Sequence, residues 1–509
     1  MITVSDAWKD IQQRFLLPES YIEIDCGITD DEAQSVAEVS GTNEAVFSNA
    51  ASVVDRDTDV IKYATLETNL WALDGTLSIL PASGEYDNAG YVSDIESTGS
   101  VAVTFPQIKT AAISGVTITW SEKLGEYAKT FTVTGKNGKD IVAEVTVTDN
   151  TDRVSVVYVP MQNYDSIVVT AHEWCLPNRR VRMESIVIGH ILKFNKSDLL
   201  SYTHEQDGDL LSGKIPKYHI EFTLDNSDGR WDPNNPTGMA QYLSERQKIT
   251  VRYGLNVNGV VEWIKAGTFY LSEWYAPPNG LEARFVARDM FEFMLGQEFD
   301  RIAASKVYGD LAYIANWAAI TPPGSSVVVT DPALTESAER QPNVSGTSAE
   351  IVQKCANAAG CIMRYSRDGA LYIETLNSSP ADYKIPLSLS YTYPEITLSK
   401  PLAGVSVDYG ADDPYILSVS EVGEQQTLAN DYIYTAEAAE NIAVWVRDVL
   451  KNRKTISGEF RADPRLDLYD IVQVEDRYGR LLTVAITNIK YTFNGSFRGS
   501  FTGRILEEG

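Results

Sequence analysis

The sequence predicts a mainly β protein of several domains with a smaller α/β part. Apolar and polar residues alternate with a period of two through most of the chain, and Thr, Val, Ile and Tyr fill these runs, which is typical of half-buried strands. Gly, Asn and Asp interrupt the runs at intervals of about ten residues, as in proteins built from many short strands. Helical periodicity is confined to a few segments. A length of 509 residues allows roughly three or four domains.

Evenly spaced runs in the first half of the chain predict an inserted jelly-roll β-sandwich at 65–189. Its expected strands are 101–105, 115–120, 130–134, 142–148, 154–159 and 167–171. A strand expected at 21–26 would join the sheet that resumes near Ser185. Residues 1–64 and 190–300 would then form one discontinuous β-domain around the insertion.

The discontinuous β-domain would begin with a short amphipathic helix at 4–15. Its later strands are expected at 218–224, 248–253, 260–270 and 282–288. A turn-rich loop at 225–233 separates the first two of these strands.

Two further domains are expected after residue 300. Residues 301–395 would be a mixed α/β domain, with helices at 306–319 and 348–358 around a loop at 321–347 that is rich in Pro, Gly and Ser. Residues 396–509 would be a closing β-domain with one helix at 436–452. That helix is the most strongly indicated, because its apolar residues recur at helical spacing.

The charge balance argues against several classes of function. Lys and Arg total 43 against 70 Asp and Glu, so the formal net charge is −27. A surface that binds the phosphate backbone needs an excess of basic residues. The 44% hydrophobic content excludes a chain that is disordered throughout. No apolar run approaches the ~20 residues that cross a bilayer, and no secretory signal peptide is visible, so we expect no membrane insertion.

Cysteine and histidine usage offers little for chemistry. Four cysteines are too few for a disulfide-built scaffold, and they suggest folding in a reducing compartment. Cys355 and Cys361 are expected to be buried rather than to act in redox or metal chemistry. The four histidines lack the spacing of a zinc site.

The acidic turn Asp225–Asp232 invites a calcium hypothesis. When it is aligned on Gly229, however, the first and twelfth ligand positions of a hand-type loop fall on Leu224 and Asn235. A hairpin turn with a proline stop at Pro233 is favoured, and an irregular metal site is the alternative.

No catalytic constellation is found. His172 is expected to be a satisfied or solvent-facing residue on a strand rather than a catalytic base. Trp71, Trp120 and Trp174 could stack on sugar rings if they were exposed, but core packing is favoured. We assign no catalytic, cofactor-binding or metal-binding residue and expect no cofactor and no enzymatic activity.

The predicted sandwich resembles discoidin-type, galactose-binding-like domains. The resemblance rests on YATLETNLW at 63–71, VTITW at 116–120, FTVTG at 131–135 and RRVRMESIVIG at 179–189. Ser185 stands where the family's closing strand has Ile. The resemblance implies binding of glycan or phospholipid through loops at one end of the sandwich. Those loops vary too much for any residue to be transferred, so the glycan-binding residues are unknown.

The rest of the chain resembles the tail hub proteins of bacteriophages and, more distantly, the baseplate hubs of contractile tails. The resemblance is carried, in order, by FTLDNSDGRWDPNNP at 222–236, YLSERQKI at 242–249, GTFYLSEW at 267–274, GEFRADPRLDLYD at 458–470 and ITNIKYTFNG at 486–495.

The hub resemblance implies a homotrimer that closes the tail tube and docks on the distal tail protein ring. Such a trimer surrounds the path of the tape-measure protein and of the DNA, which passes as cargo, and it contacts other baseplate or receptor-binding proteins. The chain would be a structural virion protein that is assembled in the host cytoplasm. Because it stops after the closing β-domain, we expect no peptidase or lysozyme-like extension.

Two other functions are alternatives: a secreted or surface carbohydrate-binding protein, and a polysaccharide or peptidoglycan hydrolase with an accessory binding domain. Two hypotheses accompany the hub reading. The sandwich would project outward and meet host glycan or a neighbouring tail protein. Part of the charge, 3 × (−27) = −81 in a trimer, would line the central passage, unless it serves only solubility.

Overall fold

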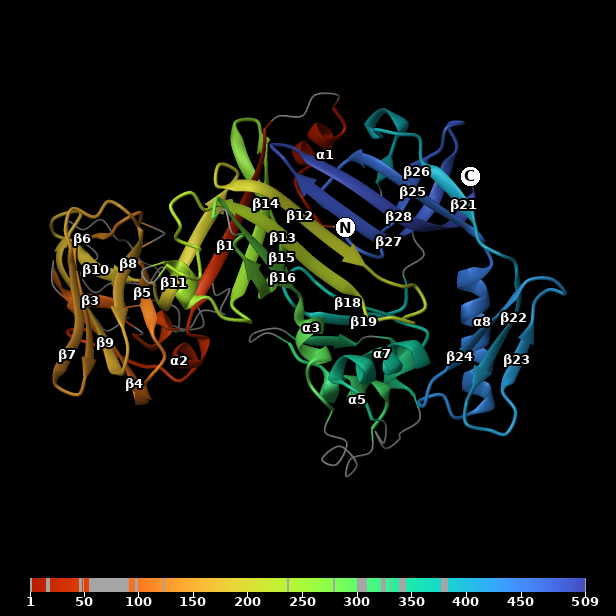
Figure 1. The fold of residues 1–509 in the computed structure, drawn as a ribbon, viewed down its shortest axis with the longest axis horizontal. Coiled ribbons are helices and arrows are strands. Elements are labelled where there is room, and N and C mark those ends of the chain that lie inside the picture. Colours follow the sequence, from red (N-terminus) through yellow and green to blue (C-terminus); the bar gives the residue numbers. More distant parts are fainter. Residues whose placement is uncertain are drawn as a thin grey trace, which may run out of the picture. The chain divides into compact units, whose positions relative to one another are not determined.

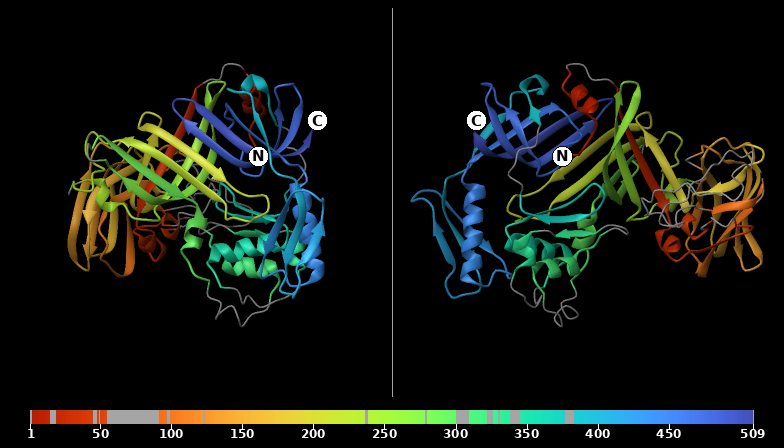
Figure 2. Two further views of the ribbon diagram at one scale, coloured as in Figure 1. Left: turned by 45° about the vertical axis from the view of Figure 1, so that its right-hand side comes forward. Right: turned by 180° about the vertical axis from the view of Figure 1, so that it is seen from behind.

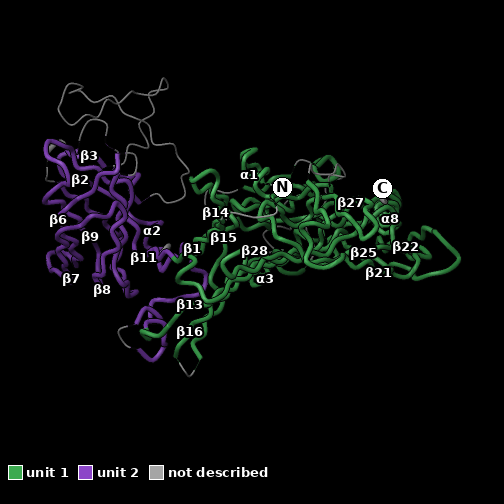
Figure 3. The backbone as a smooth tube through the Cα atoms, turned by 90° about the horizontal axis from the view of Figure 1, so that it is seen from above, with its two compact units in different colours: residues 1–24, 194–229, 248–509 green, residues 25–193, 230–247 purple. Residues whose placement is uncertain are grey.

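The structure is a computed structural model in which the chain is mainly β and divides into two compact units, coloured separately in Figure 3. It describes residues 2–14, 19–44, 48, 50–54, 91–96, 99–121, 124–235, 238–277, 280–299, 309–321, 326–329, 331–337, 345–376 and 383–508. Unit 1 comprises Met1–Ile24, Phe194–Gly229 and Lys248–Gly509. Unit 2 comprises Asp25–Lys193 and Arg230–Gln247.

Unit 2 is a β-sandwich. One sheet has the strand order β2-β4-β9-β6-β7, and β11-β5-β8 forms a second layer beside the pair β10-β3. The elements are α2 (Asp31–Ser35), β2 (Glu38–Gly41), η1 (Ala50–Val53), β3 (Tyr91–Glu96), β4 (Gly99–Lys109), β5 (Ile113–Thr119), β6 (Ala128–Asn137), β7 (Asp140–Val147), β8 (Val154–Met161), β9 (Tyr164–Trp174), β10 (Arg180–Met183), β11 (Ser185–Asn195) and η2 (Met239–Tyr242).

Alternation along the strands builds the core of unit 2. In β8 every second residue is buried, and these side chains join those of the facing sheet in one apolar cluster. Trp120 lies at its centre, with its ring centroid 5.0 Å from that of Phe131 and 5.8 Å from that of Trp174. The segment 230–247 also belongs to this unit. Its helical turn η2 packs against β5, and Trp231 is buried.

Unit 1 is built on a long sheet with the strand order β21-β25-β28-β27-β12-β13-β16-β15-β14 (Figure 1). The sheet strands are β12 (Leu199–Asp207), β13 (Lys217–Asp225), β14 (Lys248–Val257), β15 (Val260–Tyr275), β16 (Glu282–Arg288), β20 (Lys384–Ile385), β21 (Glu395–Leu398), β25 (Lys454–Arg461), β26 (Ile471–Glu475), β27 (Leu481–Phe493) and β28 (Phe497–Glu508). Strand β26 pairs with β20 and β27, and α1 (Asp6–Gln12) packs against β14.

Two smaller α/β parts complete unit 1, and both can be followed in Figure 2. In the first, helices lie beside the sheet β17-β19-β18; in the second, α8 covers one face of the sheet β23-β22-β24. The elements are α3 (Met290–Leu295), α5 (Leu311–Ala318), β17 (Val327–Val329), α6 (Pro332–Thr335), α7 (Ser348–Ala358), β18 (Ile362–Tyr365), β19 (Leu371–Glu374), η3 (Leu387–Leu389), β22 (Leu402–Asp408), β23 (Tyr415–Ser418), β24 (Glu424–Ala429) and α8 (Ala436–Leu450).

Most predicted elements are present. Helix α8 occupies the predicted 436–452 segment and buries Ile442 and Val446, and α7 spans the predicted 348–358 with a capping box between Thr347 and Glu350. The predicted strand at 21–26 is β1 (Ser20–Thr29), which is hydrogen-bonded to β11, as expected for the flanks of an insertion.

Three predictions need comment. The turn after β13 is not a hairpin, because β13 and β14 are separated by β16 and β15, and the connection instead contributes 230–247 to unit 2. The predicted loop 321–347 contains β17 and α6, since Asp331 caps a helical turn that Pro332 begins. The sandwich was predicted to begin at 65, but unit 2 begins at Asp25, and α2, β2 and η1 belong to it because β2 pairs with β4. The segment 63–71 with Trp71 and residues 306–308 lie outside the described residues.

Candidate functional site

Parts of the stretches that carry the hub resemblance come together in unit 1. The strand of the first stretch is β13, the GTFYLSEW stretch lies in β15, and the last two stretches form β25 with its following loop, and β27. Strand β13 pairs with β12, which pairs with β27, and β28 joins β27 to β25. On the other side β16 joins β13 to β15. The strand-forming parts of these stretches therefore belong to one continuous sheet, whereas the first stretch from Arg230 onward and residues 242–247 of the YLSERQKI stretch belong to unit 2.

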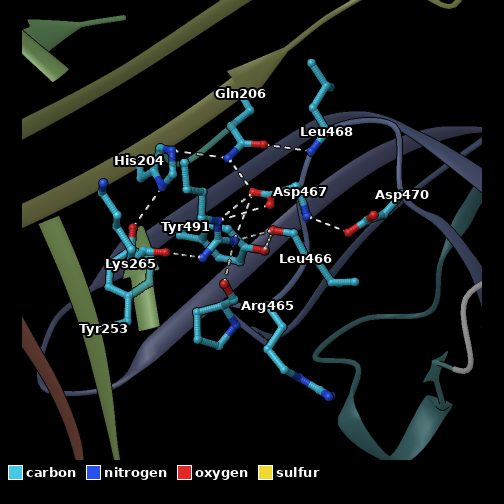
Figure 4. A network of polar contacts seen from close by, with 12 residues as sticks. His204, Gln206, Tyr253, Lys265, Arg465, Leu466, Asp467, Leu468, Asp470 and Tyr491 are labelled. Atoms are coloured by element: carbon cyan, nitrogen blue, oxygen red, sulfur yellow. Dashed lines mark hydrogen bonds and ion pairs between the residues drawn. The ribbon is translucent and has the colours of Figure 1, made fainter. Parts of the chain in front are cut away.

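The loop at 462–470, between β25 and β26, is held by a buried polar network in which Arg367 meets Asp467. Figure 4 shows Asp467 among the labelled partners from this loop and from the neighbouring strands. The Arg367 guanidinium pairs with the Asp467 carboxylate at 2.9 Å, and the two side chains are only 6% and 16% exposed. Arg367 also donates from Nη1 to the Lys265 carbonyl at 2.8 Å and from Nη2 to the Pro464 and Leu466 carbonyls at 2.7 and 3.1 Å. One side chain from the β18–β19 turn thus joins that loop to β15.

A second arm of the network reaches the central strands. Gln206 of β12 donates from Nε2 to Asp467 Oδ1 at 3.1 Å, and its Oε1 accepts from the Leu468 backbone N–H at 2.7 Å. Tyr491 of β27 donates its hydroxyl to the Leu466 carbonyl at 2.8 Å. The loop is therefore fixed to β12, β15 and β27 at once, and a buried network with its members paired makes such an arrangement rigid.

His204 continues the network into an aromatic cage. The Gln206 amide oxygen accepts the Leu468 N–H, so the amide nitrogen is the atom that faces His204. Gln206 Nε2 therefore donates to His204 Nε2, 3.4 Å away. His204 then carries its proton on Nδ1 and donates it to the Tyr253 hydroxyl at 2.8 Å, and that hydroxyl lies 2.7 Å from the Tyr202 hydroxyl. The ring of Phe269 packs edge-on at 5.3 Å. This chain of hydrogen bonds requires a neutral imidazole.

The electrostatics agree with a structural role. Burial lowers the pKa of His204 to about 3, so the ring is neutral at physiological pH. Burial alone would raise the pKa of Asp467, but the Arg367 guanidinium outweighs it and the pKa is lowered. A fixed ion pair and a neutral histidine without solvent access suit a locked scaffold better than acid–base catalysis.

The aromatic candidates in the sandwich are core residues. Trp120 is fully buried and Trp174 is 5% exposed, with its indole N–H donated to Glu126 Oε2 at 2.9 Å. Neither offers a free face to a sugar ring, so the core-packing interpretation is confirmed for both. His172 lies on the exposed face of β9, and its Nε2 is 2.8 Å from the Thr132 hydroxyl, which confirms a solvent-facing, satisfied histidine.

The cysteines and the acidic turn behave as structural features. Cys355 and Cys361 are free thiols, and the expected burial of both is confirmed. Burial raises the pKa of Cys361 to about 12. In the turn, Asp225 Oδ1 accepts from the Ser227 backbone N–H at 3.0 Å, and Gly229 adopts a φ of +70°. Within the described ranges no group of three or more His, Cys, Asp or Glu side chains could hold a metal ion.

The network at Arg367 was not identifiable from sequence. The stretch at 458–470 contains both acidic and basic residues. Nothing in their spacing indicates which distant basic residue would pair with Asp467. Arg367 lies in the turn Ser-Arg-Asp-Gly between two short strands. An arginine in a polar turn is normally solvent-exposed. Only the fold brings it against Asp467, 100 residues away in the sequence.

Comparison with known proteins finds structural likeness without sequence relatives. No protein-family model and no curated protein matches the sequence. The fold is similar to the 43 kDa tail protein of prophage MuSo2 from Shewanella oneidensis, with 15% identity over 62% of this chain and 95% of that one, and a TM-score of 0.44. It is also similar to a tail protein from Neisseria meningitidis MC58 (14% identity, 62% and 94% of the chains, TM-score 0.44). A third similar structure is prophage tail protein gp18 of Listeria monocytogenes EGD-e (11% identity, 62% and 90% of the chains, TM-score 0.40).

No helix among the described residues is both long enough and apolar enough to cross a membrane.

Proposed function

We propose that this chain is a structural protein of a phage tail tip or baseplate, in which three copies form a hub that closes the tail tube. The observation that carries the proposal is that parts of the resembling stretches contribute to one sheet of unit 1 or to the 462–470 loop, which Arg367 ties to β15 of that sheet. Stretches more than 200 residues apart in the sequence contribute strands to the same sheet. Their order along the chain is that of the tail hub proteins.

The proposal assigns a role to each part of the chain. Residues 1–64 and 190–300 would be the interrupted hub domain, 301–395 the mixed α/β domain and 396–509 the closing β-domain. These parts would dock on the distal tail ring and surround the tape-measure protein and the DNA path. Oppositely charged side chains pair on one face of the long sheet, Glu205 with Lys490 at 3.6 Å and Glu221 with Arg284 at 2.5 Å. A face of this kind suits contact with proteins and passing DNA rather than firm nucleic-acid binding.

In the same proposal the inserted sandwich at 65–189 meets host glycan or another tail protein. Its outer face supports the first alternative. Thr132 and Thr146 lie side by side at 2.9 Å between hydroxyl oxygens, and His172 adjoins them. Such a row of hydroxyl and imidazole groups can exchange hydrogen bonds with sugar hydroxyls. A glycan array probed with the full chain tests this, with Thr132→Val/Thr146→Val as the variant and Thr151→Val, at an exposed position outside the strands, as its control.

We propose no enzymatic activity. In the polar network, Arg367 is committed to Asp467 and to backbone carbonyls, and His204 is committed to the Tyr253 hydroxyl. Incubating the purified protein with peptidoglycan and host polysaccharide tests this part. Turnover that a single carboxylate substitution abolishes would replace the structural role by a hydrolase.

The experiment for the proposal as a whole is the mass of the purified full chain in solution. Mass photometry is expected to detect a species of three copies. A monomer at micromolar concentration, both alone and with tail components added, would count against the hub.

A further inference from the structure

Strand β21 ends the long sheet of unit 1 and has one free edge. It pairs with β25 from Glu395 to Leu398, and no strand among the described residues pairs with its other side. All four residues are exposed, with Leu398 at 65%. From Ile396 to Leu398 the edge carries no charge, proline or bulge. The strand is short and begins with Glu395 after Pro394, but along Ile396–Leu398 the edge presents backbone N–H and C=O groups to which a further strand can pair.

A shallow groove of about 410 Å³ adjoins this edge. Its floor follows one row of the sheet, from Glu395 through Ser457 and Thr502 to Asn488. Glu459 lies two residues after Ser457 on the same face of β25, and Tyr393, 72% exposed, also lines the groove. The groove and the free edge therefore form one continuous surface of small polar residues, two carboxylates and an aromatic ring.

The two carboxylates in this groove are not neutralised. Within the described ranges neither Glu395 nor Glu459 has an ion-pair partner, whereas Glu205, on the same sheet, pairs with Lys490. The guanidinium of Arg498 lies over the Tyr391 ring at 4.9 Å and is directed to that aromatic face. A binding partner that is complementary in charge to the groove would therefore carry positively charged side chains.

We propose that β21 binds an extended segment of a different protein as an additional strand, and that Lys or Arg at alternate positions of this segment meet Glu395 and Glu459. Backbone hydrogen bonds along Ile396–Leu398 would give affinity, and the two carboxylates would select basic side chains.

A second copy of this chain fits poorly. Among the other described strands at sheet edges, β7, β8, β23 and β24 contain no Lys or Arg, and β20 contains only Lys384. The arginines Arg182 of β10 and Arg364 of β18 already pair within the chain, with Glu126 and Glu374. This surface does not depend on the proposed tail role.

The test uses the full chain and a fluorescently labelled peptide, Thr-Lys-Val-Lys-Val-Lys-Val-Thr, with binding followed by fluorescence anisotropy at low salt. The Lys peptide is expected to bind and the same peptide with Glu for Lys is not. Glu395→Gln/Glu459→Gln should weaken binding roughly fivefold to tenfold, the effect of two exposed charge pairs. Asp413→Asn/Glu421→Gln, which removes the same charge at exposed positions elsewhere, should change binding less than twofold.

Two further peptides, N-methylated at one or the other set of alternate residues, test strand addition. One of them is expected to lose binding although its charge is unchanged, because one set must face β21. Equal binding of both, or equal weakening by the two double variants, would overturn the proposal. So would an oligomer of the chain that Leu398→Lys dissociates, since a second copy would then occupy the edge. That last result would overturn the proposed binding of a different protein but would not contradict the proposal that the chain forms a trimeric hub.

Discussion

The Arg367 guanidinium and the Asp467 carboxylate form a buried ion pair at 2.9 Å, and the remaining Arg367 N–H groups bind the Lys265, Pro464 and Leu466 carbonyls. Burying two charges is costly, and their attraction offsets this only when the other hydrogen-bonding groups are also satisfied. The pair is therefore better understood as fixing one position of the 462–470 loop than as a large net source of stability.

Removing one partner of this pair should be strongly destabilising. Arg367→Met leaves the Asp467 carboxylate buried without its cation, and we expect the free energy of unfolding of unit 1 to fall by about 3–5 kcal/mol. Urea denaturation measures this.

The double variant Arg367→Met/Asp467→Leu should recover a large part of the loss, because no unpaired charge remains. Lys400→Met, which breaks the exposed Lys400–Glu424 pair, is the control and should cause at most a small loss of stability, with the urea midpoint nearly unchanged. A loss at Arg367 no larger than that would contradict the role given to the network.

Acid should destabilise the protein through His204. Its pKa is about 3 in the folded chain and ordinarily 6.5. The unfolded state therefore binds a proton that the folded state refuses, and stability falls as pH drops from about 6.5 towards 3. At pH 5 this histidine should account for about 2 kcal/mol of the loss.

The comparison is between the wild type and His204→Gln, with denaturant midpoints measured from pH 7.5 to 4.5. Gln can still donate to Tyr253 but does not titrate, so its pH slope should be shallower. His172→Gln, on an exposed strand face, serves as the matched control. Parallel slopes for wild type and His204→Gln would show that His204 is not a buried neutral group.

Asp289 begins α3 and offers a stabilising substitution. Its Oδ1 accepts from the Phe291 backbone N–H at 3.1 Å, and Oδ2 is buried without a partner among the described residues. Burial raises the pKa of Asp289 well above its usual value, so the folded state loses stability as pH rises from about 4, where the unfolded chain ionises.

Asp289→Asn keeps the helix cap and removes the charge. It should be at least as stable as wild type at pH 8, by thermal melting, whereas Asp289→Ala should lose about 1 kcal/mol with the cap. If Asn and Ala were equally destabilising, the cap would not be the function of this side chain.

The thiols should differ in accessibility. Cys26, Cys355 and Cys361 are buried, and burial raises the pKa of Cys26 and of Cys361 to about 12. Cys175 is only partly buried. Labelling with a thiol reagent under native conditions, read by peptide mass spectrometry, should therefore modify Cys175 first. Early labelling of Cys355 or Cys361 would mean that the α7–β18 region opens readily.

Local patterns predicted the elements well and their partners poorly. Helix α8 and the strands of the sandwich follow from periodicity, because each buries one face. The prediction of a hairpin at the turn after β13 was wrong, because β13 and β14 are not neighbours in the sheet. Turn residues such as Asn226 and Gly229 indicate that the chain changes direction, but they do not indicate which strand pairs with β13. The same limit applies to Arg367, whose position in a polar turn indicates exposure, while its role depends on a loop that only the tertiary fold brings near.

The central claim is that three copies of this chain form the hub of a phage tail, and electron cryo-microscopy of the assembled particle tests it most directly. With an antibody fragment bound to this chain to mark it, the account predicts three labels around the axis at the tip of the tail tube. Labels absent from the particle, or a copy number other than three at that position, would contradict it.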